Sequence, residues 1–160
     1  MSTLRVSFHD RSASCDVDDL SAALPVGVLT LAELINADPP APEELTNAIG
    51  WLQDHLEDAT RELPMAQFAE RVELAGPGFA AVAAVEVGAT ATLPFELTRD
   101  AAEDVFRTLV TETAAARLHN PGLPAPQVHT VLGGVCAVVA VMRFLRLDTV
   151  WLVPSPEAAA

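Results

Sequence analysis

The first 26 residues contain three short runs in which apolar and polar side chains alternate. The apolar positions of these runs are Leu4-Val6-Phe8, Ala13-Cys15-Val17 and several positions within residues 20–26. Alternation with a period of two indicates strands that bury one face. Because the connections between the three runs are short, the sequence predicts an antiparallel meander at the start of the fold.

The rest of the chain predicts helices that alternate with two further strands. We expect helices over residues 27–36, 42–63, 79–87 and 126–145, another helix after an N-cap at Thr98, and strands over residues 68–74 and 149–153. The last helix is expected to bury Val131, Val135, Val138 and Met142. This order predicts one α/β domain over residues 1–153, with a five-stranded mixed sheet and flanking helices. Residues 154–160 are expected to form a disordered tail.

Charge and composition exclude several classes of function. The chain has 22 acidic and 9 basic residues, for a net charge of −13, which disfavours nucleic acid and anionic membranes as partners. Every basic residue is Arg, so a Walker A loop and a Schiff-base lysine are excluded. The amino terminus has no apolar signal region, and the longest apolar run, residues 131–142, is too short to span a bilayer. We therefore expect a cytoplasmic protein.

Cysteine and histidine spacing gives no metal or redox motif. The two cysteines, Cys15 and Cys136, lie far apart in the sequence and are expected to be reduced thiols in the core. The histidines show neither a His-x-His nor an HExxH-like spacing; they include the neighbours His9-Asp10 and the pair His119 and His129. No metal site is expected.

Three stretches share their order and spacing with a known family. They are LPVGVLTLAE and DPPAPEEL within residues 24–45, AGPGFAAV over residues 75–82, and NPGLP, VHTVLGG and VMRFLRLD within residues 120–148. Together they resemble the exopolyphosphatase / guanosine pentaphosphate phosphohydrolase (Ppx/GppA) family. The family's corresponding segments are LPLGxVRLTExF…DPPTPEEL, AGTxTTLAA and PGLPxxRADVIxGGxxVLxxxMRxLGLDEV. The resemblance covers residues 20–153, most of the chain.

The resemblance implies a particular domain of that family. It implies the second of two core domains, an RNase H-like domain of the actin-like ATPase superfamily. The family keeps its catalytic glutamate in the first domain, which has no counterpart in this sequence, so no catalytic residue is expected here. The positions that match the family's phosphate loops and the nearby glycine pair are Ser12, Gly76, Gly78, Gly133 and Gly134.

The departures from the family pattern fall on the phosphate loops. The family's DIGGGSTE turn corresponds to residues 7–14, where its glycines become His9, Asp10 and Arg11 and only Ser12 keeps its identity. Asp10 adds a negative charge where a phosphate is expected, and the side chains prevent the close backbone approach that glycine allows. In the second loop, Pro77 removes an amide donor.

Two glycine motifs each have two interpretations. The Gly76-Pro77-Gly78 segment has the strand–turn–helix position of an anion loop, but an ordinary tight turn is the favoured interpretation because one amide and the hydroxyls are missing. The pair Gly133-Gly134 lies within an expected helix, where each glycine costs about 1 kcal/mol relative to alanine. It either borders a phosphate cleft or allows a close helix–sheet crossing.

These observations lead to two functional hypotheses of different classes. The first is a degenerate Ppx/GppA-like domain that is noncatalytic and acts through protein association or weak ligand binding. It is expected to form a homo-oligomer or to bind a protein partner, with no cofactor. The alternative is an exopolyphosphatase or guanosine pentaphosphate phosphohydrolase, active only with a partner chain that supplies the missing domain, and dependent on magnesium.

Overall fold

The computed structural model describes residues 1–155. The strands are β1 (Thr3–Phe8), β2 (Ala13–Val17), β3 (Leu20–Leu24), β4 (Arg71–Ala75), β5 (Phe95–Thr98) and β6 (Thr149–Val153). The helices are α1 (Val28–Glu33), α2 (Pro42–Glu62), α3 (Phe79–Val87), α4 (Arg99–Thr111), α5 (Ala114–Arg117) and α6 (Thr130–Leu145), with short 3-10 turns at Pro64–Phe68 and Ala125–Gln127. Of the tail expected at residues 154–160, all but Pro154 and Ser155 lies outside the described residues.

The six strands form one mixed sheet in the order β3-β2-β1-β4-β6-β5. Strands β1, β4 and β6 are parallel, whereas β2, β3 and β5 each pair antiparallel with a neighbour. The predicted meander is confirmed, but the prediction of five strands is wrong. The additional strand, β5, has only four residues, and its last residue, Thr98, is also the N-cap of α4, where its hydroxyl accepts a hydrogen bond from the amide of Ala101 at 3.2 Å. Its partner β6 is about fifty residues away in sequence, so no local signal marks it.

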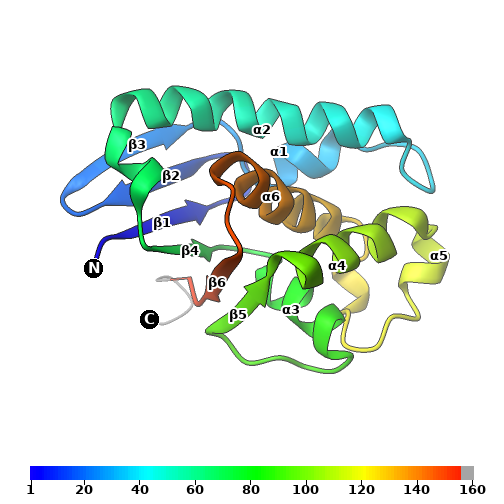
Figure 1. Ribbon diagram of the computed structural model, residues 1–160. Helices are drawn as coiled ribbons and strands as arrows, with labels where there is room; N and C mark the ends of the chain where they lie inside the picture. The colour runs from blue at the N-terminus through cyan, green and yellow to red at the C-terminus, as the bar shows by residue number, and fades with distance from the viewer. Residues whose placement is uncertain (156–160) are drawn as a thin grey trace.

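The helices form one layer on one face of the sheet (Figure 1). The chain passes from β1 to β4 and then to β6 in the same direction across the sheet, and right-handed crossovers in one direction lie on the same face. Side chains on that face, such as Leu4, Leu74 and Leu152, are buried. On the opposite face most side chains are partly or fully exposed, including Arg5, Glu73 and Trp151.

Helix α6 is the centre of the helical layer and contacts α1, α2, α3 and α4. Val131, Val135, Val138 and Met142 are buried, as the sequence predicts. The helix begins at Thr130 rather than at residue 126, because the segment Ala125–Gln127 forms a separate 3-10 turn that includes Pro126. Within residues 1–155, no helix combines the length and the apolar character that a membrane crossing requires.

Other boundaries differ from the predictions by a few residues. Helix α1 ends at Glu33, β3 ends at Leu24, and β4 begins at Arg71 after the 3-10 turn Pro64–Phe68. The short helix α5 has no counterpart in the prediction. It begins at an N-cap, Thr113, whose hydroxyl accepts a hydrogen bond from the amide of Ala116.

Candidate functional site

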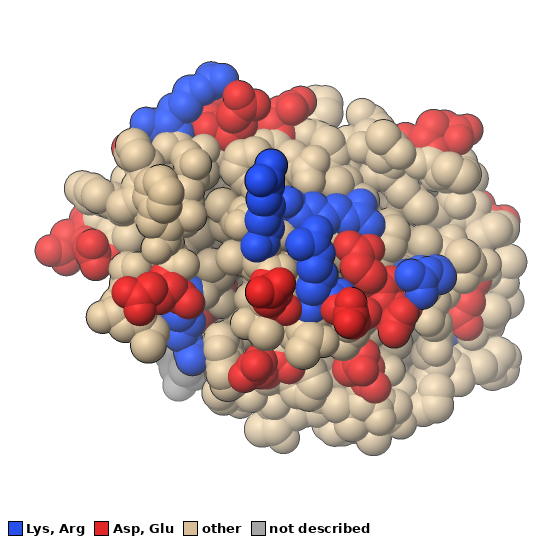
Figure 2. Space-filling view, viewed as in Figure 1, with Lys and Arg blue, Asp and Glu red and all other residues tan. Residues whose placement is uncertain are grey.

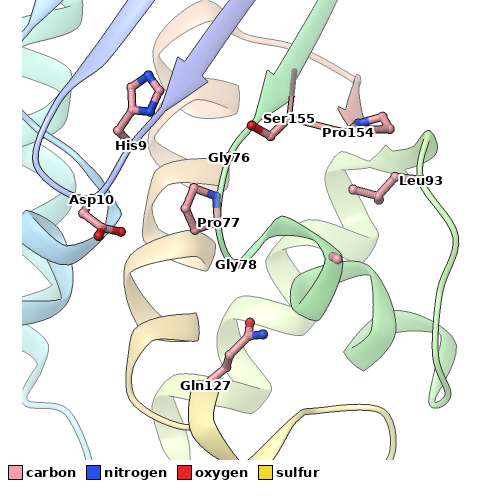
Figure 3. A pocket seen from close by; sticks show the side chains of 10 residues that line it. His9, Asp10, Gly76, Pro77, Gly78, Leu93, Gln127, Pro154 and Ser155 are labelled. Atoms are coloured by element: carbon pink, nitrogen blue, oxygen red, sulfur yellow. The ribbon is translucent and has the colours of Figure 1, made fainter. Parts of the chain in front are cut away.

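A cleft of about 650 Å³ lies where the parallel strands end (Figure 3). Its lining comes from the turn after β1, the turn between β4 and α3, the residues after β6, and the segment before α6. The lining residues are His9, Asp10, Gly76, Pro77, Gly78, Ala80, Leu93, Gln127, Pro154 and Ser155. The carboxyl ends of parallel strands are the usual position of ligand sites in open α/β sheets.

A second hollow of about 290 Å³ adjoins the cleft near the start of α1. The two hollows share Asp10, Pro77, Gly78 and Gln127. In Figure 3, Asp10 lies beside the end of β1, Pro77 lies across from it, and Gln127 lies at the opposite end from Ser155. Asp10 and the Pro77-Gly78 segment therefore border both hollows.

The turn between β1 and β2 is fixed by backbone contacts with α1. The amide of His9 donates to the carbonyl of Ser12 at 2.8 Å and closes the turn. The carbonyl of His9 accepts a hydrogen bond from the amide of Val28 at 3.1 Å, and the carbonyl of Asp10 accepts one from the amide of Leu29 at 2.8 Å. A Cβ added to Gly27 would overlap the backbone of His9, Asp10 and Arg11. The β1–β2 turn thus caps the amino end of α1 by accepting hydrogen bonds from its first amides.

The turn between β4 and α3 has a different construction. Gly76 and Gly78 have φ angles of +140° and +92°, in the range that favours glycine. A Cβ on Gly76 would also overlap the carbonyl oxygen of Phe8, at the end of β1. Helix α3 follows directly, and its first intrahelical bond runs from the amide of Val82 to the carbonyl of Gly78 at 3.1 Å. Pro77, between the two glycines, supplies no amide to the turn.

The glycine pair in α6 lies behind the cleft and is buried. A Cβ on Gly133 would overlap the carbonyl oxygen of Val28, so this glycine allows the close crossing of α6 and α1. A Cβ on Gly134 would be 3.5 Å from the carbonyl oxygen of Gly78, an ordinary contact. The close-crossing interpretation therefore applies to Gly133, with helix α1 rather than the sheet as the neighbour.

Among the five residues that the sequence suggested, only Gly76 and Gly78 line the cleft. Ser12 is exposed in the β1–β2 turn and does not line it, and Gly133 and Gly134 support the cleft from behind. Gln127 and Leu93 also line the cleft, although the sequence did not suggest them as site residues. No local pattern identifies them, because each is carried to the cleft by the packing of a loop.

Comparison with solved structures identifies the fold. The chain superimposes on an exopolyphosphatase-like protein with a TM-score of 0.86 at 15% identity, covering 96% of this chain and 55% of that structure. It matches a Ppx/GppA family member of Aquifex aeolicus with a TM-score of 0.79 at 17% identity, covering 99% and 54%. An exopolyphosphatase from Cytophaga hutchinsonii gives 0.78 at 12% identity, covering 96% and 53%.

The chain has the fold of one Ppx/GppA domain. It spans a little over half the length of each of these structures. No protein-family model matches the sequence, and no curated protein matches it. The likeness in structure, at such low identity, therefore shows the architecture that the three sequence stretches imply.

No arginine lines the cleft in the described part of this Ppx/GppA-like domain. Six of the nine arginines pair with acidic side chains; they are Arg5, Arg11, Arg61, Arg71, Arg107 and Arg143. On the side of the molecule seen in Figure 2, arginine side chains gather near the centre of the face and acidic side chains lie directly beside them. The cations of the chain are therefore largely neutralised by its own carboxylates.

The remaining three arginines are also away from the cleft. Arg117 is buried and donates to the backbone carbonyls of Leu109, Glu112 and Val128, and burial lowers its pKa. The backbone of Arg99 bonds to Asp148 just before β6, at the opposite end of the sheet from the cleft. Arg146 follows α6 at that same end.

The ion pair between Arg11 and Glu33 links the β1–β2 turn to α1. The two terminal guanidinium nitrogens of Arg11 donate to the Glu33 carboxylate. These hydrogen bonds hold the pKa of Glu33 below its usual range and raise the pKa of Arg11. Arg11 is therefore engaged outside the cleft, while its neighbour Asp10 faces into it.

The two cysteines are free and buried, as the sequence predicts. Burial raises the pKa of both thiols to about 12, and a thiol that stays protonated at neutral pH is a poor nucleophile. Within residues 1–155, no three His, Cys, Asp or Glu side chains are grouped closely enough to hold a metal ion by themselves.

Proposed function

We propose that this chain is a degenerate second domain of the Ppx/GppA type that is noncatalytic by itself and acts through association with another protein chain. The observation that carries this proposal is the chemistry of the cleft. The cleft keeps the place and shape of a ligand site, but it presents the carboxylate of Asp10 and no arginine. Phosphoryl transfer depends on charge neutralisation and positioning, and neither is provided for a polyanion.

The uncovered face of the sheet supports association. Parallel strands are usually covered on both faces. In this domain helix α6 and the helices that pack on it, α1, α2, α3 and α4, lie on one face of β1, β4 and β6 (Figure 1). On the other side, Glu73 accepts hydrogen bonds from Arg5 and Arg71, and the guanidinium of Arg71 stacks 4.3 Å from the ring centre of Trp151. This ordered polar surface suits a protein interface.

Exposed apolar side chains give further support. Phe68 and Trp51 have exposed fractions of 77% and 46%, and aromatic side chains are common anchors in protein interfaces. These residues lie on the 3-10 turn before β4 and on α2. The chain thus offers more than one surface for a second copy or a different protein.

The proposal is tested by two measurements on the purified full chain. We expect no magnesium-dependent phosphate release from long-chain polyphosphate, ATP or guanosine pentaphosphate, and sedimentation velocity should show an oligomer or a stable complex with a co-purifying chain. Sustained turnover by the chain alone would contradict the noncatalytic role. A monodisperse monomer with no bound protein would contradict the association.

The second candidate function is a phosphohydrolase completed by a partner chain. It is favoured by the start of α3 at the cleft, because the amino end of a helix attracts anions. Magnesium is commonly held by one or two carboxylates together with substrate phosphates, and Asp10 is the residue of this chain that would hold it. The ion would neutralise phosphate charge. The remaining catalytic groups would come from the partner.

A cleft variant separates the two candidates. Gln127 lines the cleft and lies on the short 3-10 turn Ala125–Gln127, before the buried helix α6. If a complex with a partner releases phosphate, Gln127→Ala should lower the rate when the cleft is the active site. An equally active Gln127→Ala complex would place the activity on the partner alone.

A further inference from the structure

The cleft holds a carboxylate that is available for binding. The side chain of Asp10 is exposed at the cleft, and its charged neighbour in sequence, Arg11, interacts with it electrostatically but donates its hydrogen bonds to Glu33. The backbone of Asp10, by contrast, is fixed, because its carbonyl accepts from the amides of Leu29 and Thr30 at 2.8 and 3.2 Å. The backbone that carries this exposed carboxylate is therefore held in place at the edge of the cleft.

We infer that the cleft binds the guanidinium group of an arginine side chain from a partner protein, with Asp10 as the charged acceptor. This inference rests on the proposed association and names the chemistry of the partner. A carboxylate accepts a guanidinium through two parallel hydrogen bonds. The side-chain oxygen of Gln127, which borders both hollows with Asp10, is a second acceptor for the remaining donors.

The rest of the lining fits the stem of an arginine. Pro77, Ala80 and Leu93 supply apolar surface beside Asp10, and the methylene groups of an arginine pack on such surfaces while the head remains polar. The volume of about 650 Å³ exceeds that of one side chain. It leaves room for the neighbouring backbone of the partner segment.

The charge balance favours a cation over an anion. The amino end of α3 contributes about half a positive charge, less than the full negative charge of Asp10. No arginine in the described residues lines the cleft, and the adjacent Arg11, which interacts with Asp10 electrostatically, donates its hydrogen bonds to Glu33. The net charge of −13 draws cationic segments toward the molecule. The same field repels a polyphosphate.

The probe for this inference is the peptide acetyl-Gly-Arg-Gly-amide, with a citrulline peptide of the same length as its neutral match. Binding is followed on the ¹⁵N-labelled full chain by amide chemical shifts. We expect saturable shifts at Gly76, Gly78, Ala80 and the side-chain amide of Gln127, with much smaller shifts for the citrulline peptide. Asp10→Asn should weaken binding of the arginine peptide by about tenfold, the size of a charge-assisted hydrogen bond.

Asp54→Asn is the matched control, because Asp54 is an exposed carboxylate on α2 and away from the cleft. It should leave the affinity unchanged. The inference is overturned if Asp10→Asn and Asp54→Asn weaken binding equally, or if magnesium pyrophosphate shifts the cleft amides and the arginine peptide does not. A monomeric chain in sedimentation would remove the proposed association without altering the peptide result, so the two failures are distinguishable.

Discussion

The two turns that border the cleft contrast in how they are held. The β1–β2 turn directs its carbonyls toward the first amides of α1 and is supported at Gly27. The β4–α3 turn keeps two glycines with positive φ and leads directly into α3. Two adjacent glycines of helix α6 pack against the elements that adjoin these turns. Gly133 lies against α1, and Gly134 lies against Gly78.

The contrast separates the shape of a site from its chemistry. Both turns contain close backbone approaches, at Gly27 and Gly76, and a side chain at either glycine would overlap the neighbouring backbone. The side chains exposed in the cleft are not constrained in this way. We therefore expect substitutions of Asp10 and Pro77 to alter binding at the cleft more than they alter the fold.

The largest effect is expected from adding a methyl group to one turn or the other. Gly27→Ala should lower the free energy of unfolding by about 3 kcal/mol or more, because the new Cβ meets three backbone atoms that cannot move independently. A Cβ on Gly78 makes only an ordinary contact, 3.9 Å from the Cα of Gly134, but φ is +92°, so Gly78→Ala should cost only about 1–2 kcal/mol. Urea denaturation of both variants measures the difference. Equal losses would mean that the two turns are held alike.

A smaller effect is expected from the glycine pair of α6. Gly133→Ala should destabilise the protein by about 2 kcal/mol, since the overlap with Val28 outweighs the gain in helix propensity. Gly134→Ala meets only ordinary contacts and should be neutral or stabilising by up to about 1 kcal/mol. Thermal unfolding of the two variants provides the comparison. A stabilising Gly133→Ala would show that α1 and α6 separate easily.

The affinity of the cleft for pyrophosphate tests how much each of the two turns opposes phosphate binding. Asp10→Asn should raise the affinity for pyrophosphate by about tenfold at low salt, because like charges no longer face each other. Pro77→Thr restores one amide and one hydroxyl and should have a smaller effect. Calorimetric titration of both variants provides the measurement. If Pro77→Thr alone gives the larger gain, the β4–α3 turn is the main obstacle.

The smallest effect is expected at the exposed pair Arg11–Glu33. The hydrogen bonds from Arg11 lower the pKa of Glu33, so the contribution of the pair is present above the ordinary glutamate pKa. It is lost as the pH falls through the lowered value. NMR titration should show a midpoint below the usual range that rises in Arg11→Gln, with no measurable change in stability at neutral pH. An unchanged midpoint would show that the pair does not form in solution.

The sequence alone was sufficient for the elements with strong local periodicity. Alternation gave the meander, the continuous apolar stretch gave the buried α6, and Thr98 was recognisable as an N-cap because a hydroxyl before a helix has a local role. Three dispersed stretches also predicted the Ppx/GppA architecture. The resemblance also predicted that His9, Asp10 and Arg11 stand where the family has its phosphate-loop glycines, and this correspondence stays a prediction.

Only the tertiary structure decided the features that depend on distant partners. Strand β5 exists because β6 offers an edge to four residues about fifty positions away. Gly133 and Gly134 look equivalent in sequence, yet one meets the backbone of α1 and the other meets Gly78. Asp10 and Gln127 border the same cleft because the strands end beside the segment before α6. Local periodicity reports which face of an element is buried, but it carries no information about which distant backbone lies against that face.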